Sequence, residues 1–434
     1  MKTWGFAAIF FMAALFSTDV HANSSLQELV NQTPVNGVIT LENKTYEGNL
    51  VITKPVTLKG SGSTVIKGDG TGNVIVVKAP GVHLENLTVK NSSFNRNTAE
   101  EFAAIKVHTD HNVLKNIVIT DSYHGVYLSQ AHHNEVSDIQ VTGKSVEEIA
   151  GQGNGIMVYY SNKNKLSDIT IKYTRDGIYF EKADDNVVTN AHISYTRYGL
   201  HYMYSDRGHM TNNSFVANTA GAALMHSQNL VLTNNLIALQ QGTRAFGVML
   251  QSCDDSIIQD NDFYQNQRAL YIDQSSGNRI EGNRILQNQV GIELWASSMD
   301  HVFTKNFIDK NTAPVIMIGG QARNQWNENG IGNDWGTGFP LMDLDQNGIG
   351  DHSVQYKSSL NKLIEENELV YLFLKSPAIG IYELIGKFLH NQNVMVEDQF
   401  PLVTKQESNP LPWVTGFTLL LVGYVYMKGR RKSQ

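Results

Sequence analysis

The chain has 434 residues, with 34 lysines and arginines against 41 aspartates and glutamates, for a formal net charge of -7. This acidic balance gives no positive field to attract nucleic acid, so no nucleic-acid partner is expected. The single cysteine, Cys253, excludes an internal disulfide and any metal site built from several cysteines.

The two ends carry signals for export and for membrane attachment. Residues 1–22 are predicted to be a signal peptide, because Lys2 precedes a short apolar run and Val20-His21-Ala22 resembles a cleavage site. Residues 411–427 are uncharged and near the short limit for a transmembrane helix, and a buried or interfacial helix is the alternative. The basic residues of 428–434 predict a cytoplasmic tail, which places the body outside the cytoplasm as a single-pass anchored protein.

The middle of the chain repeats a short phrase that begins with a small residue and continues with alternating apolar and polar residues. The phrase starts at Gly155, Gly177, Gly199, Gly221, Gly247, Ala269, Gly291 and Ala313, and the interval is 22 residues except for one of 26. This period, with strands too short to be helices, predicts an all-β fold: a right-handed, single-stranded parallel β-helix over residues 23–335. Asparagines such as Asn186, Asn213, Asn235 and Asn278 are expected in its turns.

Strand alternation assigns a face to each residue of the phrase. The first and third residues after the small one are apolar and are predicted to point into the core, so the second and fourth line one outer sheet. The outward set that we regard as functional comprises Met157, Tyr159, Tyr179, Glu181, His201, Met203, Met225, Met249, Tyr271, Asp273, Glu293 and Trp295.

Two chemistries fit this outer stripe. The tyrosines, the tryptophan, Met157 and the carboxylates resemble a carbohydrate-binding surface, on which rings stack against sugars. His201, Met203, Met225 and Met249 form a soft ligand set that suits Cu(I). A third interpretation is that a partner or a flanking segment covers the stripe, since exposed methionines and aromatics often mark such contacts.

A calcium site is predicted in residues 336–358. Oxygen ligands alternate at Asp343, Asp345, Asn347, Ile349 and Asp351, the fourth of these through its backbone carbonyl, and glycine stands at the sixth place, as in a calcium loop. The usual glutamate at the twelfth place is replaced by Val354, so an ordinary acidic turn is the alternative.

The sequence changes character after the repeats. Residues 359–390 are predicted to form short amphipathic helices, which either dock on a membrane protein or cap the last coil. Residues 391–410 are predicted to be a polar linker that leads to the transmembrane helix.

Several phrases resemble the NosD family. These are GNGIMVYYSN (153–162), RDGIYFEKADDN (175–186), RYGLHYMYSD (197–206), GAALMHSQNL (221–230), the GNDW…DLDQNGIGD ending (332–351) and LVYLFLKSPAI (369–379). The likeness covers nearly the whole mature chain, and the RYGLHYM and SPAI phrases are far more specific than the repeat itself.

The resemblance implies a periplasmic accessory protein in nitrous oxide reductase maturation, a part of denitrification, and not an enzyme. Its implied partners are an ABC permease and its ATPase, a copper chaperone and the apo-reductase, whose copper-sulfur cluster it would help to assemble. His201 and Met203, with Met225, are the implied contacts with copper or a partner. The chain contains no P-loop, so it cannot itself supply the energy. The alternative function is a polysaccharide lyase, hydrolase or epimerase that uses the outer stripe.

Overall fold

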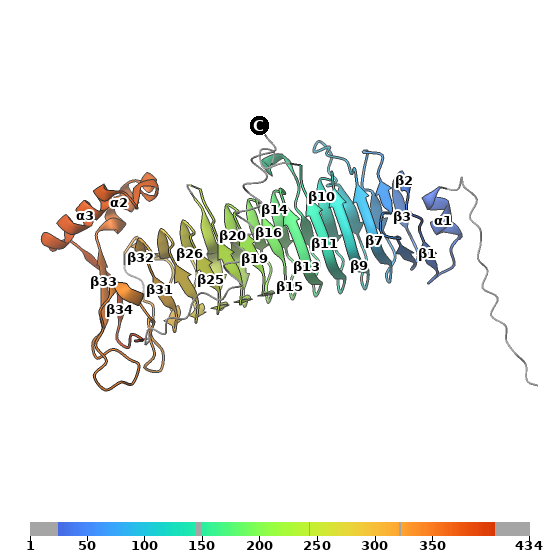
Figure 1. Cartoon of the computed structure of the whole chain (residues 1–434). Coiled ribbons are helices and arrows are strands. Elements are labelled where there is room, and N and C mark those ends of the chain that lie inside the picture. The colour runs from blue at the N-terminus through green and yellow to red at the C-terminus, as the bar shows by residue number, and fades with distance from the viewer. Residues whose placement is uncertain (1–24, 145–148, 243, 321–322, 404–434) are drawn as a thin grey trace, which may run out of the picture.

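The computed structural model describes residues 25–144, 149–242, 244–320 and 323–403. Figure 1 shows an elongated solenoid whose coils are stacked in sequence order between an N-terminal helix and a C-terminal helical tail. The predicted signal peptide (1–22), transmembrane helix (411–427) and basic tail (428–434) lie outside the described residues. Within those residues, none of the helices combines the length and the apolar character that a membrane span requires.

Helix α1 (Leu26–Gln32) closes the first coil. Ser25 begins the helix with a capping box, in which its side chain accepts a hydrogen bond from the backbone of Glu28 and the Glu28 side chain accepts one from the backbone of Ser25. Leu26 and Val30, one helical turn apart, are buried against the core of the solenoid.

One side of the solenoid is a parallel sheet of twelve strands, one from each coil, which confirms the all-β parallel solenoid of the right-handed type. Its strands are β3 (Leu50–Ile52), β6 (Ile75–Val77), β8 (Ala103–Val107), β10 (His124–Ser129), β12 (Ile156–Tyr159), β14 (Asp176–Glu181), β17 (Tyr198–Met203), β20 (Ala220–Gln228), β23 (Phe246–Asp254), β26 (Arg268–Asp273), β29 (Val290–Trp295) and β32 (Ala313–Ile318). We call it the twelve-stranded sheet.

The remaining sides of the coils form a second sheet of twenty strands. They are β1 (Val38–Thr40), β2 (Thr45–Glu47), β4 (Thr57–Lys59), β5 (Val65–Lys67), β7 (His83–Lys90), β9 (Val113–Thr120), β11 (Glu135–Thr142), β13 (Lys165–Lys172), β15 (Val187–Thr189), β16 (His192–Ser194), β18 (His209–Thr211), β19 (Ser214–Val216), β21 (Val231–Thr233), β22 (Leu236–Ala238), β24 (Ile257–Gln259), β25 (Asp262–Tyr264), β27 (Arg279–Glu281), β28 (Arg284–Leu286), β30 (Val302–Thr304) and β31 (Phe307–Asp309). Asn190, Asn212 and Asn234 bend consecutive coils between two short strands, with φ of 54°, 58° and 56° that asparagine tolerates well.

The predicted inward residues form the core. Ile156, Val158, Ile178 and Phe180 are fully buried, and their counterparts on later coils continue the same rows. The strand register places each residue beside its equivalent 22 positions later, as in Ile156 beside Ile178. Alternation therefore assigned the inner face of this sheet correctly.

The four turn asparagines named from the sequence are buried, and they belong to ladders that run along the solenoid. The backbone N–H of Asn213 donates to the side-chain oxygen of Asn235 at 2.9 Å, and Asn235 donates in the same way to Asn261 at 2.9 Å. Each amide group thus satisfies a backbone donor that a turn would otherwise leave unpaired.

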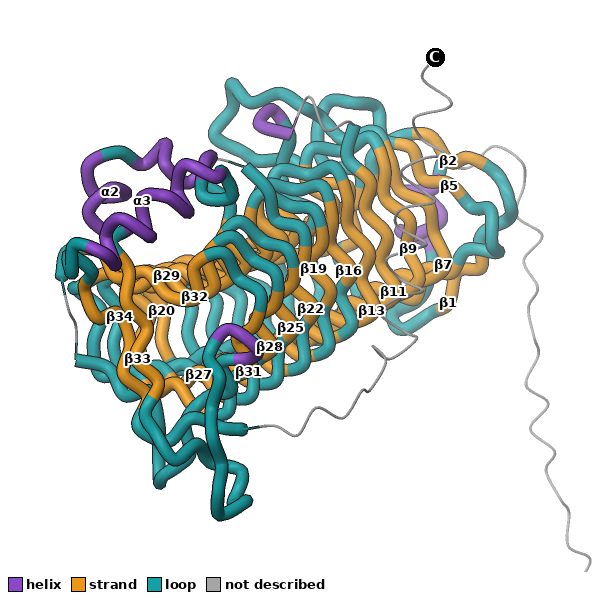
Figure 2. Tube along the Cα trace, turned by 60° about the vertical axis from the view of Figure 1, so that its left-hand side comes forward, coloured by secondary structure: helices purple, strands orange, loops and turns teal. Residues whose placement is uncertain are grey.

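The C-terminal tail consists of α2 (Leu360–Glu366), the 3-10 helix η3 (Glu368–Phe373) and α3 (Pro377–Phe388). Figure 2 shows α2 and α3 standing over β29 and β32 at the end of the solenoid. Leu360, Ile364 and Tyr371 pack against Val290 and Ile316 on the outer face of the twelve-stranded sheet. One face of the tail therefore caps the last coils, as one of the two predicted alternatives required. Two further 3-10 turns are η1 (Ile149–Gly151) and η2 (Gly336–Gly338).

The prediction of a linker at residues 391–410 is wrong for its first part. Residues 393–398 form strand β34 (Asn393–Asp398), which pairs antiparallel with β33 (Val354–Ser358). Met395 and Val396 are buried in the main core, while Asp398 accepts hydrogen bonds from the indole N–H of Trp335 at 2.9 Å and from the backbone of Asn333 at 2.7 Å. The polar residues that suggested a linker include this buried carboxylate, which closes the open end of an asparagine ladder.

Candidate functional site

The predicted outward residues lie in two parallel rows on the twelve-stranded sheet. We call the first the histidine row; it runs in register through Tyr127, Met157, Tyr179, His201, Ala223, Met249, Tyr271 and Glu293. The second, the methionine row, runs through Tyr159, Glu181, Met203, Met225, Gln251 and Asp273. Many members are more buried than an open stripe predicts, because adjacent side chains in a row pack on each other.

His201 is the most constrained polar residue of the stripe. Its Nδ1 lies 3.1 Å from Oδ2 of Asp176, and Arg197 donates to both Asp176 oxygens, at 2.8 and 2.6 Å. Burial opposes ionisation of Asp176, but the hydrogen bonds from His201 and Arg197 outweigh it and lower the pKa of this carboxyl. An ionised Asp176 can only accept, so His201 donates from Nδ1, and Nε2 is the ring nitrogen left for another partner.

The Nε2 atom of His201 is buried and makes no hydrogen bond with any of the residues that the structure describes. The rings of Tyr179 and Tyr198 flank the imidazole at centroid distances of 4.7 and 5.1 Å. A histidine whose Nδ1 is held by a carboxylate and whose Nε2 is open has the arrangement that metal-binding histidines commonly use. Asp176 was missed from the sequence, because it belongs to the preceding coil and lies 25 residues away.

The four residues predicted to bind copper are only partly brought together. Met203 and Met225 are direct neighbours on β17 and β20, so their Cα atoms are about 4.8 Å apart. Met249 lies two strands from His201, with Ala223 between them, and packs with Met225 and Phe246 in an apolar cluster. In the described parts of the chain, no group of three or more histidine, cysteine, aspartate or glutamate side chains is placed to hold a metal ion. The copper site therefore stays a prediction.

The residues proposed for sugar binding divide between the two ends of the stripe. Glu181 and Asp273 stand four strands apart, which corresponds to about 19 Å, whereas paired glycosidase carboxylates are about 5 to 10 Å apart. Tyr179 donates from its hydroxyl to Glu181 at 2.9 Å. At the other end, Trp295 is exposed and Asp273 accepts a hydrogen bond from the Ser297 hydroxyl at 2.8 Å.

Glu293 is covered by the C-terminal tail and is only 1% exposed. The hydroxyl of Tyr371 in η3 donates to Glu293 at 2.5 Å, and Arg268 lies 3.6 Å from the same carboxylate and 4.3 Å from the centre of the Tyr371 ring. Burial and the nearby Glu293 raise the pKa of Tyr371, which keeps the phenol protonated as the donor. This cluster fixes the tail to the stripe.

A groove with a volume of about 880 Å³ lies over the N-terminal half of the histidine row. Besides Tyr179, Glu181 and His201, its lining includes Glu101, Lys106, His124 and Arg175, none of which was selected from the sequence. The signal available in the sequence was an irregular spacing, because a similar phrase, GVYLSQ at Gly125, precedes the one at Gly155 by 30 residues instead of 22. Residues 152–154 of this longer coil line the groove.

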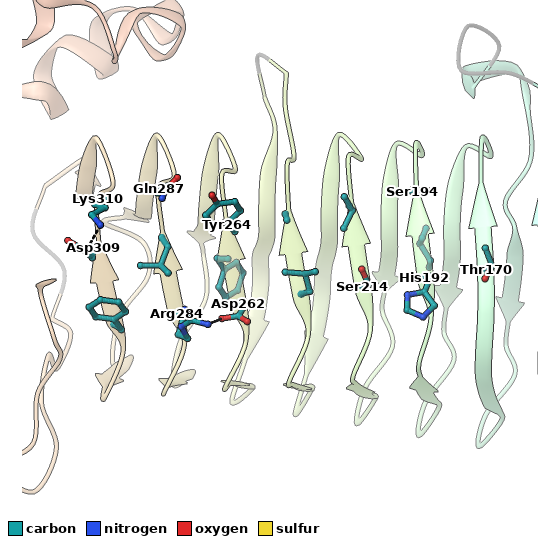
Figure 3. Close-up of a pocket in the computed structure, with 17 residues that line it drawn as sticks. Thr170, His192, Ser194, Ser214, Asp262, Tyr264, Arg284, Gln287, Asp309 and Lys310 are labelled. Carbon is teal, nitrogen blue, oxygen red and sulfur yellow. Dashed lines mark hydrogen bonds and ion pairs between the residues drawn. The ribbon is translucent and has the colours of Figure 1, made fainter. Parts of the chain in front are cut away.

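A second hollow of about 450 Å³ lies on the twenty-stranded sheet (Figure 3). Its floor is mainly apolar and includes Leu236, Tyr264 and Leu286, and an ion pair of 3.1 Å between Arg284 and Asp262 stands at its side. The repeat phrase does not indicate this hollow, because the phrase covers only one strand of each coil.

The predicted calcium loop folds around its own backbone. Asp343 accepts hydrogen bonds from the backbone of Asn347 and Gly348 at 3.0 Å each, and Asp351 accepts one from Leu344 at 2.9 Å. Gly348, at the sixth place, has a φ of +85° that favours glycine. No observation tests calcium binding.

The chain matches a protein-family model and is similar to known proteins. Residues 137–338 match the family model described as "Periplasmic copper-binding protein (NosD)". The chain is 33% identical to the "Probable ABC transporter binding protein NosD" of Pseudomonas aeruginosa, over 85% of this chain and 88% of that protein. It is 29% identical to the protein of the same name from Stutzerimonas stutzeri, over 82% of this chain and 85% of that protein.

Solved structures with a similar fold have low identity. An alginate lyase from Paenibacillus sp. is 18% identical, with a TM-score of 0.46, over 54% of this chain and 91% of that chain. A family 28 exopolygalacturonase of Yersinia enterocolitica is 9% identical, with a TM-score of 0.43, over 71% of this chain and 76% of that chain. These likenesses concern the fold and not the activity.

Proposed function

This chain belongs to the NosD family, and from that premise we propose that it is an extracytoplasmic accessory protein for nitrous oxide reductase maturation. In this proposal it helps to assemble the copper-sulfur cluster of the reductase together with an ABC transporter and a copper chaperone. It is not an enzyme: an ATPase on a separate chain supplies the energy, and copper is cargo that it receives and passes on.

The observation that carries this proposal is the Nε2 atom of His201, which is buried and has no hydrogen-bond partner among the described residues. Asp176 orients the imidazole through Nδ1, and the rings of Tyr179 and Tyr198 flank it. Met203 is the next residue of β17 on the same face of the sheet, and Met225 lies beside Met203 on the neighbouring coil. An imidazole nitrogen and thioether sulfurs form a soft ligand set that favours Cu(I) over hard divalent ions. A site with so few ligands suits transfer of the ion better than permanent storage.

The chain offers a matched test of this ligand set. We would titrate the full chain with Cu(I) in competition with a chromophoric chelator, beside a His201→Ala/Met203→Ala/Met225→Ala variant. The control is His209→Ala/Met299→Ala/Met342→Ala, which removes one exposed histidine and two exposed methionines elsewhere. Stoichiometric binding lost only in the first variant supports the proposal. Equal binding by both variants, or no binding by the native chain, contradicts it.

The helical tail supports docking on the permease of the ABC transporter. Its buried side chains are fixed to the solenoid, yet the tail also exposes a series of apolar side chains, among which Phe388 is 82% exposed. The series comprises Leu369, Leu372, Phe373, Ile381, Leu384, Ile385, Phe388 and Leu389. An apolar patch of this kind on a protein outside the cytoplasm fits a protein partner in the membrane.

Two further parts of the proposal concern attachment and calcium. Residues 411–427 anchor the protein in the cytoplasmic membrane, with the basic residues of 428–434 on the cytoplasmic side. The loop of Asp343, Asp345, Asn347, Ile349 and Asp351 binds Ca²⁺ through its oxygens, of which those of Asp343 already lie at the turn of Gly348. A calorimetric Ca²⁺ titration of the native chain and of Asp343→Asn/Asp345→Asn tests this site, and absence of heat in the native chain contradicts it.

A further inference from the structure

The groove over the N-terminal half of the histidine row has the form of a ligand site. Its floor is the face of the twelve-stranded sheet, with Tyr127, Met157 and Tyr179 on successive strands. Residues 98–101 line one side and residues 152–154 line another. Two partly exposed tyrosines of the lining, Tyr159 and Tyr179, stand on adjacent strands about 4.8 Å apart, which suits rings in neighbouring units of a linear ligand.

Most charged groups of the groove are already paired. Lys106 lies 3.0 Å from Glu100, His124 lies 3.6 Å from Glu101, and Arg197 is paired with Asp176. Burial and the Glu181 carboxylate raise the pKa of Tyr179, so its phenol is a hydrogen-bond donor and not a base. Paired groups of this kind have spare lone pairs and protons for polar ligands, but they leave no unpaired cation for the carboxylate of a ligand.

Arg175 is the exception. It is half-buried in the lining, and its guanidinium forms no hydrogen bond or ion pair with any residue in the described ranges. After the hydrogen bond from His124, the positive charges around Glu101, including Arg175, contribute to lowering the pKa of Glu101. A guanidinium presents a planar fork of donors that matches a carboxylate, so an open arginine in a groove indicates a ligand with such a group.

From these features we infer that the groove binds an acidic oligosaccharide, a glycan that carries a carboxylate on some of its sugars. Tyr159 and Tyr179, which are partly exposed, stack on sugar rings, Glu181 accepts hydrogen bonds from hydroxyls, and Arg175 binds the carboxylate. This role is binding without cleavage and is additional to the proposed function, because the residues assigned to the sugar differ from His201, Met203 and Met225, which are assigned to copper.

A peptide ligand is less well supported by the same groove. Peptides commonly add a strand to a sheet edge, but the strands of this floor are paired on both sides, as β12 is with β10 and β14. The lining also carries two partly exposed tyrosines, Tyr159 and Tyr179, beside paired polar groups. Sugar rings use ring faces and paired polar groups directly.

The test uses calorimetric titration of the full chain with tetragalacturonate, a carboxylated probe, and with maltotetraose, a neutral probe of equal length. We expect tetragalacturonate to bind at one site, and Arg175→Gln to weaken it at least about tenfold, as loss of a charge-assisted hydrogen bond requires. Arg175→Lys should recover part of the loss. The matched control is Arg207→Gln, which removes a guanidinium paired with Asp184 and Asp185 outside the groove.

Three results would overturn the inference. They are no binding of tetragalacturonate, equal loss in Arg175→Gln and Arg207→Gln, or tighter binding of an acidic peptide such as tetraglutamate than of the sugar. Thermal unfolding of each variant shows whether it is folded. If Arg175→Gln does not fold, Glu181→Gln replaces it as the variant that tests the groove. Met203→Ala/Met225→Ala should leave sugar binding unchanged. The sugar titration therefore tests the groove, and the Cu(I) titration tests the copper proposal, independently of each other.

Discussion

Replacement of Tyr371 by phenylalanine is expected to loosen the helical tail and leave the solenoid intact. The Tyr371 hydroxyl donates to Glu293 at 2.5 Å, and Glu293 is 1% exposed, so no water can replace the lost donor. A hydrogen bond to a charged group contributes about 1.5 to 3 kcal/mol, and burial places this one in the upper part of that range, at about 2 to 3 kcal/mol. Arg268, 3.6 Å from Glu293, remains and keeps the carboxylate partly compensated.

Hydrogen exchange with mass spectrometry measures this change directly. A loss of about 2 to 3 kcal/mol predicts exchange about 30 to 150 times faster for protected amides of α2 and α3, if they open as one local unit. Strands such as β14 and β17 should keep their native rates. The control is Tyr204→Phe, because Tyr204 is 53% exposed and its hydroxyl has access to water. If the tail amides of Tyr371→Phe exchange within about threefold of the native rate, the proposed attachment is refuted.

Three other predictions concern stability, reactivity and docking. Burial lowers the pKa of His301 to about 4. As the pH falls below 6.5, the unfolded chain therefore takes up a proton before the folded chain does, and the free energy of unfolding decreases until the pH reaches about 4. His301 Nδ1 accepts a hydrogen bond from the backbone of Asn278, and an asparagine at position 301 could accept the same bond. Between pH 7.5 and 5, the free energy of unfolding in urea should therefore fall by about 2 kcal/mol less for His301→Asn than for the native chain, and an equal fall would contradict this. Burial also raises the pKa of Cys253 to about 12, so an aromatic disulfide reagent at pH 8 should react only after unfolding, and rapid labelling of the native chain would disprove that. Leu384→Ser/Phe388→Ser should reduce copurification with the ABC permease at least about tenfold without lowering the melting temperature, whereas Val35→Ser/Met299→Ser, also exposed, should not.

The regular part of the fold could be predicted because its information is local and repeated. The interval of 22 residues gave the coils, and alternation around Gly155 and Gly177 separated core residues such as Ile178 from outward ones such as Tyr179. Features made by distant segments could not be predicted in this way. Glu293 was taken as a surface residue, yet it is covered by Tyr371, 78 residues later in the chain.

The same distinction holds for the candidate site. Side-chain type and strand position selected His201, but the orientation of its ring depends on Asp176, which belongs to the preceding coil and is held by Arg197, directly before β17. The linker prediction failed for a related reason, because the polar Asp398 is buried under hydrogen bonds from Trp335 and Asn333. Composition alone cannot distinguish such a buried carboxylate from a solvated one.

The most direct test of the proposed function is reductase maturation in cells that lack this chain. Nitrous oxide reductase would be purified from such cells, with and without the native chain supplied again, and its activity, copper and acid-labile sulfide would be measured together with the amount of polypeptide. The proposal predicts normal polypeptide without the copper-sulfur cluster, and recovery of cluster and activity when the native chain is returned. A fully assembled and active reductase in the absence of the chain would contradict it.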